Sequence, residues 1–458
     1  MRRFATTLAV LLLFDAGSAL AEASATEGLR NPAPETRQDR NSAHPATPTQ
    51  VLLINQVAPR THFYHSDVLE PWAQDVAEVT GGRVQVRFST APLGSYRRNF
   101  DMAWSGLVDL AGGNQSSNPG RFRLVMINES PYLGTSDPES ISVALWRTYT
   151  QHLAAAGEFA GTEVLALHVS SLQQLYTTVQ PVREMADLQG LKIAAPSELG
   201  ADLIARLGAI PVLLTAPEIH DGLSRGIIDG VSMGPTGTSR LHLYPFLKYE
   251  TPVADGAGLS WGGFYLVANR RSWQRIDAED RRRIRAISGE AFARRAARVF
   301  IERTVDAASE LQRAGIVRIA PSADFERRFR AAAAFIDEAW VEHANANGID
   351  GAAVLESFRI EVRREAGRLG RLSAAGAVTF PAAPTTLVLP ANPATTVLRS
   401  NPVTPALPVT LALPVTPALP GTPALPISPA LSIPETTPAH RAAPAVPAVP
   451  AVPTVPAA

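Results

Sequence analysis

The feature that most constrains the fold is a regular alternation of strand-like and helix-like segments. The first part of the alternation runs over Val51–Asn55, His65–Val79, Arg83–Phe88, Tyr96–Trp104 and Val108–Ala111. In the second of these segments Val68, Leu69 and Trp72 recur at helical spacing, whereas the third alternates polar and apolar side chains as a strand does. The order strand, helix, strand, helix, strand is typical of a parallel sheet.

A second series of the same kind follows, and three long amphipathic segments come after it. The series runs over Glu163–Leu167, Lys192–Ile193, Glu198–Leu207, Ile210–Leu214, Pro217–Arg225 and Ile227–Ile228. The long segments, which we expect to be helices, are Ala278–Gly315, Ala323–Asn345 and Ala352–Leu369. The 322 residues from 51 to 372 are enough for two domains of about 150 residues each. The sequence therefore predicts the α/β class, with two α/β domains closed by long C-terminal helices rather than a single barrel.

The first 21 residues have the layout of an export signal. Arg2 and Arg3 precede the apolar run Leu8–Phe14, and Ala19-Leu20-Ala21 fits the small-residue cleavage pattern. A membrane anchor is the alternative, but this run falls far short of the roughly 20 apolar residues needed to cross a bilayer. We expect a signal peptide at 1–21, cleaved near Ala21, and an exported protein that does not itself span a membrane. Residues 22–50 lack periodicity, which predicts a flexible leader.

Proline dominates the C-terminal end. Of the 38 prolines, 20 lie between Pro381 and Pro456, where the charged residues are Arg399, Glu435 and Arg441. Proline forbids helix and removes a donor from a sheet ladder. We therefore expect residues 373–458 to form a Pro-rich low-complexity tail of polyproline-II-like or disordered character, outside any core.

Charge and cysteine content exclude several function classes. The 42 basic and 42 acidic residues cancel, so nucleic acid is a poor partner, because phosphate binding needs a cationic excess. Cysteine is absent, which removes disulfides, thiolate nucleophiles and cysteine-bound metals. His62 and His65 are spaced for a shared metal, yet no carboxylate completes an evident set. Neither a metal nor another cofactor is expected.

One segment resembles the nucleophile elbow of a serine hydrolase. Gly230–Gly234 fits the pattern G-x-S-x-G with Ser232 as nucleophile, and Asp255 and His343 follow in the required order. However, Pro235 follows the serine closely and no Gly-rich oxyanion loop precedes it. We expect no enzyme, and a hydrolase remains an alternative.

Seven short motifs occur in one order over nearly 300 residues. They are Glu78–Val84, Leu93–Gly94, Gly106–Leu110, Glu129–Leu133, Leu188–Ile193, Leu207–Val212 and Glu218–Gly230. This string resembles the extracytoplasmic solute-binding subunit of tripartite ATP-independent periplasmic (TRAP) transporters, over about Val51–Asn347. Locally, glycines such as Gly81 and Gly82 permit the left-handed turns between helix and strand.

The resemblance implies a bilobed periplasmic binding protein whose lobes are joined by hinge strands and a long helix. Such a receptor closes on a small organic molecule and presents it to a TRAP-type membrane permease. We expect lobe 1 to comprise 51–171 and 259–300, and lobe 2 to comprise 172–258 and 301–372. A periplasmic sensor that reports its ligand to a signalling partner is an alternative of the same physical class.

The resemblance also implies an arginine that grips a ligand carboxylate through two charge-assisted hydrogen bonds. That position is Ala194 in this sequence, and a second such arginine falls near Gln174. The polar residue expected after the Asp-Gly turn falls at Met233. Either the ligand is uncharged, or another cation, for which Arg60 and Arg97 are candidates, replaces the missing one.

Loops at the carboxyl ends of parallel strands form the ligand crevice in folds of this class. This rule selects residues after the first and third strands, on the crossing strand, after the Asp-Gly turn and before the strand at 264–267. They are Arg60, His62, Asn114, Gln115, Gln174, Tyr176, Met233 and Trp261. Amide side chains can both donate and accept hydrogen bonds, and tryptophan offers a face for stacking. We expect these residues, with Ala194, to form the ligand site.

Overall fold

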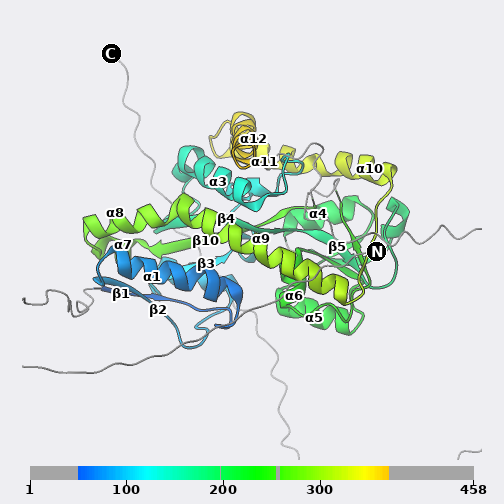
Figure 1. The fold of residues 1–458 in the computed structure, drawn as a ribbon. Helices are drawn as coiled ribbons and strands as arrows, with labels where there is room; N and C mark the ends of the chain where they lie inside the picture. Colours follow the sequence, from blue (N-terminus) through cyan, green and yellow to red (C-terminus); the bar gives the residue numbers. More distant parts are fainter. Residues whose placement is uncertain (1–49, 196, 254–257, 371–458) are drawn as a thin grey trace, which may run out of the picture. The chain divides into compact units, whose positions relative to one another are not determined.

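Two sheets organise the part of the chain that the structure describes. The structure is a computed structural model, and it describes residues 50–370 apart from 196 and 254–257. The expected signal peptide, nearly all of the leader and the Pro-rich tail lie outside these residues. All described residues belong to one compact unit. The strand orders are β2-β1-β3-β10-β4 in one sheet and β11-β9-β5-β8-β6-β7 in the other (Figure 1).

The first sheet belongs to lobe 1. Its strands are β1 (Gln50–Ile54), β2 (Val84–Phe88), β3 (Leu110–Asn114), β4 (Thr162–Leu172) and β10 (Trp261–Asn269). β1 pairs in parallel with β2 and β3, as expected, whereas β10 enters antiparallel between β3 and β4. The helices and helical turns of this region are η1 (Tyr64–Leu69), α1 (Glu70–Val79), α2 (Tyr96–Ser105), η2 (Gln115–Ser117), η3 (Val125–Glu129), α3 (Pro138–Thr148), η4 (Tyr149–Leu153), η5 (Ala154–Ala156), α7 (Arg270–Arg275) and α8 (Ala278–Ile287).

The second sheet belongs to lobe 2. Its strands are β5 (Gln174–Thr177), β6 (Lys192–Ala195), β7 (Ile210–Leu213), β8 (Gly230–Met233), β9 (Tyr249–Thr251) and β11 (Val317–Arg318). β6 lies between β7 and β8 in parallel, and β5 runs antiparallel to β8 and β9. Its helices are η6 (Met185–Leu188), α4 (Glu198–Arg206), α5 (Ala216–Ser224), α6 (Pro235–Arg240) and α10 (Ala323–Ala333). The fold is therefore the predicted bilobed α/β fold.

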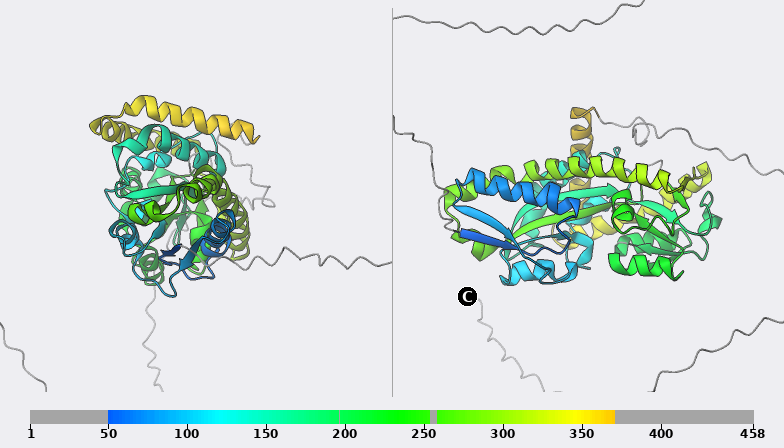
Figure 2. Two further views of the ribbon diagram at one scale, coloured as in Figure 1. Left: turned by 90° about the vertical axis from the view of Figure 1, so that its left-hand side faces the viewer. Right: turned by 60° about the horizontal axis from the view of Figure 1, so that its bottom comes forward.

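Several connections join the lobes. β4 and β5 are separated only by Gln173, so the chain passes directly from one sheet to the other. The chain returns between β9 and β10. The long helix α9 (Gly289–Arg313) packs on α3 and β4 in lobe 1 and on α6 in lobe 2, so it lies along both lobes (Figures 1 and 2).

The expected helix 278–315 is two helices. Gly289, which separates α8 from α9, has a positive φ of 55°. A Cβ at this position would lie 2.7 Å from Cζ2 of Trp146. Both the backbone conformation and the close indole therefore favour glycine here, and the chain bends where periodicity alone predicts a continuous helix.

The C-terminal helices divide between the lobes. Phe325 and Phe329 of α10 lie in the core of lobe 2. Trp340 of α11 (Phe335–Ala346) and Phe358 of α12 (Gly351–Arg368) lie in the core of lobe 1, and α12 packs on α3. The expected assignment of all of 301–372 to lobe 2 thus differs from these contacts. An amphipathic pattern shows that one helix face is buried, but not which lobe buries it.

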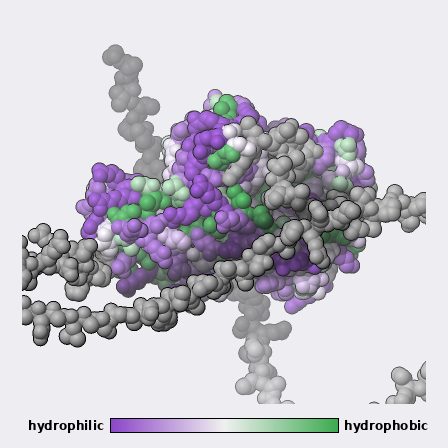
Figure 3. Space-filling view, viewed as in Figure 1, coloured by the Kyte–Doolittle hydropathy of each residue, from purple (hydrophilic) through white to green (hydrophobic). Residues whose placement is uncertain are grey.

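Hydrophilic residues make up most of the coloured surface on the face that Figure 3 shows. On α8, Arg282 and Arg283 both form ion pairs with Glu279. Among residues 50–370, excluding the undescribed positions, no helix combines the length and the apolar character needed to cross a membrane.

Candidate ligand-binding site

A cavity of about 890 Å³ opens between the two lobes. Residues that follow the carboxyl ends of β1, β3, β6, β7 and β8 all contribute to its lining, as the crevice rule predicts. Lobe 1 supplies, among others, His62, Tyr96 and Asn114, and lobe 2 supplies Thr215 and Arg240. A molecule in this cavity would touch both lobes.

Aromatic side chains form one wall of the cavity. Tyr64 lies with its ring centroid 5.3 Å from that of Phe264 and 6.2 Å from that of Phe300, and all three line the cavity. The Tyr64 hydroxyl lies 2.9 Å from Nε2 of His168, which is fully buried behind it. Burial raises the pKa of Tyr64 well above its usual value, so the phenol stays neutral. This wall suits a flat apolar group.

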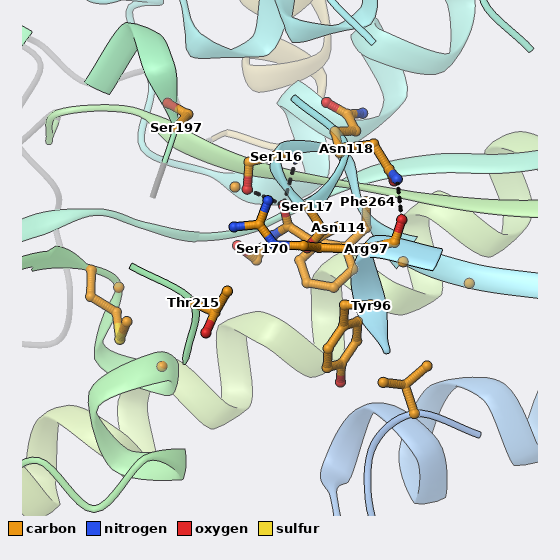
Figure 4. A pocket seen from close by; sticks show the side chains of 18 of the residues that line it. Tyr96, Arg97, Asn114, Ser116, Ser117, Asn118, Ser170, Ser197, Thr215 and Phe264 are labelled. Atoms are coloured by element: carbon orange, nitrogen blue, oxygen red, sulfur yellow. Dashed lines mark hydrogen bonds between the residues drawn. The ribbon is translucent and has the colours of Figure 1, made fainter. Parts of the chain in front are cut away.

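Arg97 reaches into the cavity from the start of α2. Its guanidinium lies beside Ser116 and Ser170, and its chain crosses in front of the Phe264 ring (Figure 4). The backbone of Arg97 is fixed, because the Asn118 side-chain amide donates a 2.8 Å hydrogen bond to its carbonyl oxygen. Asn114 Oδ1 in turn accepts hydrogen bonds from the Ser116 amide (2.9 Å) and hydroxyl (2.5 Å).

Arg240 enters the cavity from the opposite lobe, as the last residue of α6. Its side chain is exposed, and partial desolvation by the surrounding protein lowers its pKa. Burial and then the charge of Arg240 lower the pKa of His62 to about 4. Burial raises the pKa of Tyr96, and the charge of Arg240 opposes this rise. Arg240 therefore lies near two groups of lobe 1 that are both neutral at pH 7.

The charged residues that line the cavity give it a cationic excess. They are Arg97, Arg123, Arg240, Glu198 and Asp202. Within the described part of the chain, no carboxylate forms an ion pair with any of the three arginines. An acidic ligand would supply the missing partner.

The residues predicted from sequence separate into two groups. His62, Asn114, Gln115 and Met233 line the cavity. Gln115 is buried beside Gly263, where a Cβ would lie only 2.1 Å from Gln115 Oε1. The structure thus brings together the predicted residues that follow β1 and β3 and the one at the end of β8.

The other predicted residues do not line the cavity. Tyr176 and Ala194 lie in an apolar core of lobe 2, and Trp261 lies in a core of lobe 1. Gln174 is buried, and its Oε1 accepts a 3.1 Å hydrogen bond from the Val253 amide. Arg60 is exposed outside the cavity. Side chains inside a strand point to the two helix-covered faces of a sheet. The cavity lies at the strand ends instead. This difference explains why Ala195, the last residue of β6, lines the cavity and Ala194 does not.

Sequence reasoning missed several lining residues. They include Tyr96, Ser170, Ser171, Gln173, Ser197, Thr215, Thr236, Arg240, Phe264 and Phe300. Applying the strand-end rule to β6, β7 and β8 as well as to β1 and β3 would have found Ser197, Thr215 and Thr236. No sequence signal distinguishes Arg240 from the many exposed arginines of the chain.

Ser232 is a structural residue at the junction of the lobes, where it also borders the cavity. Its hydroxyl donates a 3.2 Å hydrogen bond to Gln173 Oε1, and it is almost fully buried. Nearby, the hydroxyls of Ser171 and Thr236 lie 2.7 Å apart. The hydroxyl of a serine nucleophile bonds to a histidine, and Ser232 has a glutamine in that place. Asp255, the other member of the alternative triad, lies outside the described residues.

Two α/β lobes, hinge strands between them and a cavity that both lobes line define a bilobed solute-binding protein. Residues 54–343 match the sequence model of the bacterial extracellular solute-binding protein family 7, and the chain belongs to this family. The predicted membership of the TRAP solute receptors is confirmed.

Proteins of known structure and a named relative are similar to this chain. A TRAP periplasmic solute-binding protein from Bordetella bronchiseptica with bound (R)- and (S)-mandelate is 29% identical, with a TM-score of 0.65, and the match covers 69% of this chain and 99% of that one. One from Rhodoferax ferrireducens in complex with copurified benzoate is 26% identical, with a TM-score of 0.64, over 70% of this chain and 99% of that one. The outer membrane transporter protein TsaT of Comamonas testosteroni is 28% identical over 311 residues, 68% of this chain and 91% of TsaT.

The protein is therefore an extracytoplasmic solute receptor that captures a small organic molecule and delivers it to a membrane permease. It is a binding protein and not an enzyme, because its family and its structural relatives are substrate-binding receptors. The serine hydrolase alternative is set aside.

Proposed function

We propose that this receptor binds a small aromatic carboxylic acid, with Arg97 as the anchor of the carboxylate. The observation that carries the proposal is an arginine that forms no ion pair with a carboxylate among the described residues, in the same cavity as a wall of aromatic rings. The arginine favours a ligand with an acidic group, and the aromatic wall favours a ligand with a ring.

The acid end of the site consists of the Arg97 guanidinium and the polar side chains around it. A guanidinium presents a planar fork that matches a carboxylate through two parallel hydrogen bonds. Asn114, Ser116 and Ser170 lie around the fork and add side-chain amide and hydroxyl groups (Figure 4). In this arrangement Arg97 replaces the arginine that the family resemblance implies at Ala194, a position buried in the core of lobe 2.

The apolar end of the site is the wall of Tyr64, Phe264 and Phe300. These rings contact one another at centroid distances of 5.3 to 6.2 Å, which leaves little freedom for rearrangement. A ligand ring would gain from burial against this wall and from ring–ring contact of about 0.5–1.5 kcal/mol. Two relatives at 29% and 26% identity hold mandelate and benzoate, both aromatic acids.

Calorimetric titration tests the proposal. Benzoate and mandelate should bind, and benzamide, which keeps the ring and lacks the charge, should bind much more weakly. Arg97→Gln should weaken benzoate by about 10- to 150-fold, the equivalent of about 1.5–3 kcal/mol for hydrogen bonds to a charged group. Arg60→Gln is the matched control, because Arg60 is exposed and outside the cavity. Equal affinity for benzamide and benzoate would refute the proposal.

We also propose that export removes residues 1–21. The basic start, the apolar run Leu8–Phe14 and the small residues before Ala21 support this. N-terminal sequencing of the mature protein should give Glu22 as its first residue. An intact Met1 on protein recovered from the periplasm would contradict this cleavage.

A further inference from the structure

Arg240 is a second cation in the cavity, and the proposed anchor at Arg97 does not use it. It lies on lobe 2, at the end of the short helix α6, whereas Arg97 lies on lobe 1. α6 packs on the long helix α9, and the Thr238 hydroxyl donates a 2.7 Å hydrogen bond to the Pro235 carbonyl oxygen within α6. The backbone that carries Arg240 is therefore held in place.

The two arginines lie in different parts of the cavity. Arg240 lies close enough to His62 and Tyr96 to alter the pKa of both. Arg97 instead lies beside Ser116 and Ser170 (Figure 4). Although Tyr96 and Arg97 are adjacent in sequence, Figure 4 shows the Tyr96 hydroxyl pointing away from the Arg97 guanidinium.

Nothing around Arg240 in the described residues neutralises its charge. His62 is neutral at pH 7, because its pKa is lowered to about 4, and the phenol of Tyr96 is neutral as well. Glu198 and Asp202, the carboxylates that line the cavity, lie on α4 and form no ion pair with Arg240 in the described structure. The third cavity arginine, Arg123, lies beside His343 instead. Arg240 is exposed within the cavity and forms no ion pair in the described structure, so its guanidinium is available to an anionic group of a ligand.

We propose that the ligand carries a second acidic group, which Arg240 binds while Arg97 binds the first. The substrate class is then an aromatic compound with two acidic substituents, and this rests on the proposed function. The phenol of Tyr96 and the imidazole of His62 can donate further hydrogen bonds to the second group. Because each acid is bound by a different lobe, such a ligand links the lobes directly.

Calorimetric titration with four probes tests this inference. The probes are benzoate, benzene-1,3-dicarboxylate, benzene-1,4-dicarboxylate and succinate. At least one aromatic diacid should bind the wild type about 10-fold or more tightly than benzoate, because it gains a charge-assisted pair. Succinate should bind more weakly than that diacid, because it lacks the ring.

Two variants of Arg240 test whether this residue binds the second acidic group of the ligand. Arg240→Gln should reduce the diacid to about the affinity of benzoate and change benzoate by less than about 3-fold, whereas Arg97→Gln should weaken both. Arg225→Gln, an exposed arginine of lobe 2 outside the cavity, is the matched control. Arg240→Lys keeps the charge without the fork and should retain part of the preference, which guards against a folding defect in the glutamine variant.

Three results would overturn the inference. If neither diacid binds more tightly than benzoate, the second acid is absent and the proposed function stands. If Arg240→Gln weakens benzoate as much as the diacids, both arginines share a single carboxylate. If none of the aromatic acids binds, the proposed function itself fails and the inference fails with it.

Discussion

Glu129 is a buried carboxyl group that joins the two lobes. It ends η3 of lobe 1, and its Oε2 accepts a 2.9 Å hydrogen bond from the hydroxyl of Ser197, which begins α4 of lobe 2. Burial raises the pKa of Glu129 to about 7, and the hydrogen bond from Ser197 opposes this rise only in part. The carboxyl group is therefore protonated in the folded protein over a pH range in which an unfolded chain has released the proton.

This difference predicts a pH effect on stability. The folded state keeps the proton up to about pH 7, while the unfolded chain loses it near 4.5, so the contribution of Glu129 to the free energy of unfolding falls as pH rises through this window. Glu129→Gln removes the titration. Relative to wild type, the variant should gain about 2–3 kcal/mol of unfolding free energy between pH 5 and pH 8. Urea denaturation of both proteins at several pH values measures this, and parallel curves would contradict it.

A second prediction at this scale concerns Ser232. Ser232→Ala removes its hydrogen bond to Gln173, which should cost about 0.5–1.5 kcal/mol of stability. Ligand affinity should change by less than about 3-fold, since a neutral hydrogen bond within the hinge is lost and no charge is exposed. A serine-directed phosphonate should not label the wild type. Labelling at Ser232 would show that its hydroxyl is activated, contrary to its assignment as a structural residue.

Single residues of the site were predictable from sequence only where a strand end settled their position. His62 follows β1 and Asn114 ends β3, and both line the cavity. Arg60 and Arg97 were equal candidates for the cation; both are exposed, and only the fold shows that Arg97 lines the cavity and Arg60 does not. Sequence spacing does not specify the direction of a loop side chain, because that direction depends on contacts between distant segments.

At the scale of elements, α12 is fixed by packing and by an ion-pair network. Phe358 is fully buried in the core of lobe 1. Arg147 of α3 forms ion pairs with Glu361 and Glu365 of α12, and with Glu290 of α9 at 2.8 Å. Hydrogen bonds from several arginines lower the pKa of Glu365 to about 2, against the effect of its burial. These contacts hold α12 on lobe 1 and away from the cavity.

Phe358→Ala should therefore destabilise the protein without changing the site. Removal of a buried phenylalanine ring typically costs about 3–5 kcal/mol, through lost transfer free energy and the space left behind. Ile360→Ala, on the exposed side of the same helix, should cost less than about 0.5 kcal/mol. Chemical denaturation measures both variants, and ligand affinity at a temperature where both are folded should match wild type. A small cost for Phe358→Ala would mean that α12 contributes little to the core.

The elements that sequence predicts best are those with one buried face. α2 and α4 were expected nearly at their observed bounds, because apolar residues recur on one side of each. By contrast, α3 was missed, since almost all of its residues are buried and no amphipathic stripe appears. Its signals were local ones, Asp137 as N-cap and Pro138 in the first turn. The strand expected at Ile227–Ile228 forms instead at Gly230–Met233.

At the scale of the whole molecule, the connections between the lobes permit a hinge motion. Gln173 alone separates β4 from β5, and its side chain accepts the hydrogen bond from Ser232 of β8. The lobes have distinct apolar cores, and the helices α9 and α11 each contribute residues to a core of both lobes, so a rotation of the lobes would involve these two helices as well as the strand connection. A ligand that contacts both lobes favours the closed arrangement in proportion to its affinity difference for the two states.

Ligand binding should therefore make the receptor more compact. A saturating aromatic acid should lower the radius of gyration measured by small-angle X-ray scattering for residues 22–375 of the wild type. Arg97→Gln at the same ligand concentration should show a smaller change, because fewer molecules are bound, and should recover the full change when the ligand is raised in proportion to its weaker affinity.

Arg240→Gln tests whether the second acidic group contributes to closure of the lobes and not only to ligand affinity. If the second acid links the lobes, a saturating aromatic diacid should compact this variant less than it compacts wild type even when every site is filled. Equal compaction at saturation would show that contact with lobe 1 and the aromatic wall suffices to close the lobes.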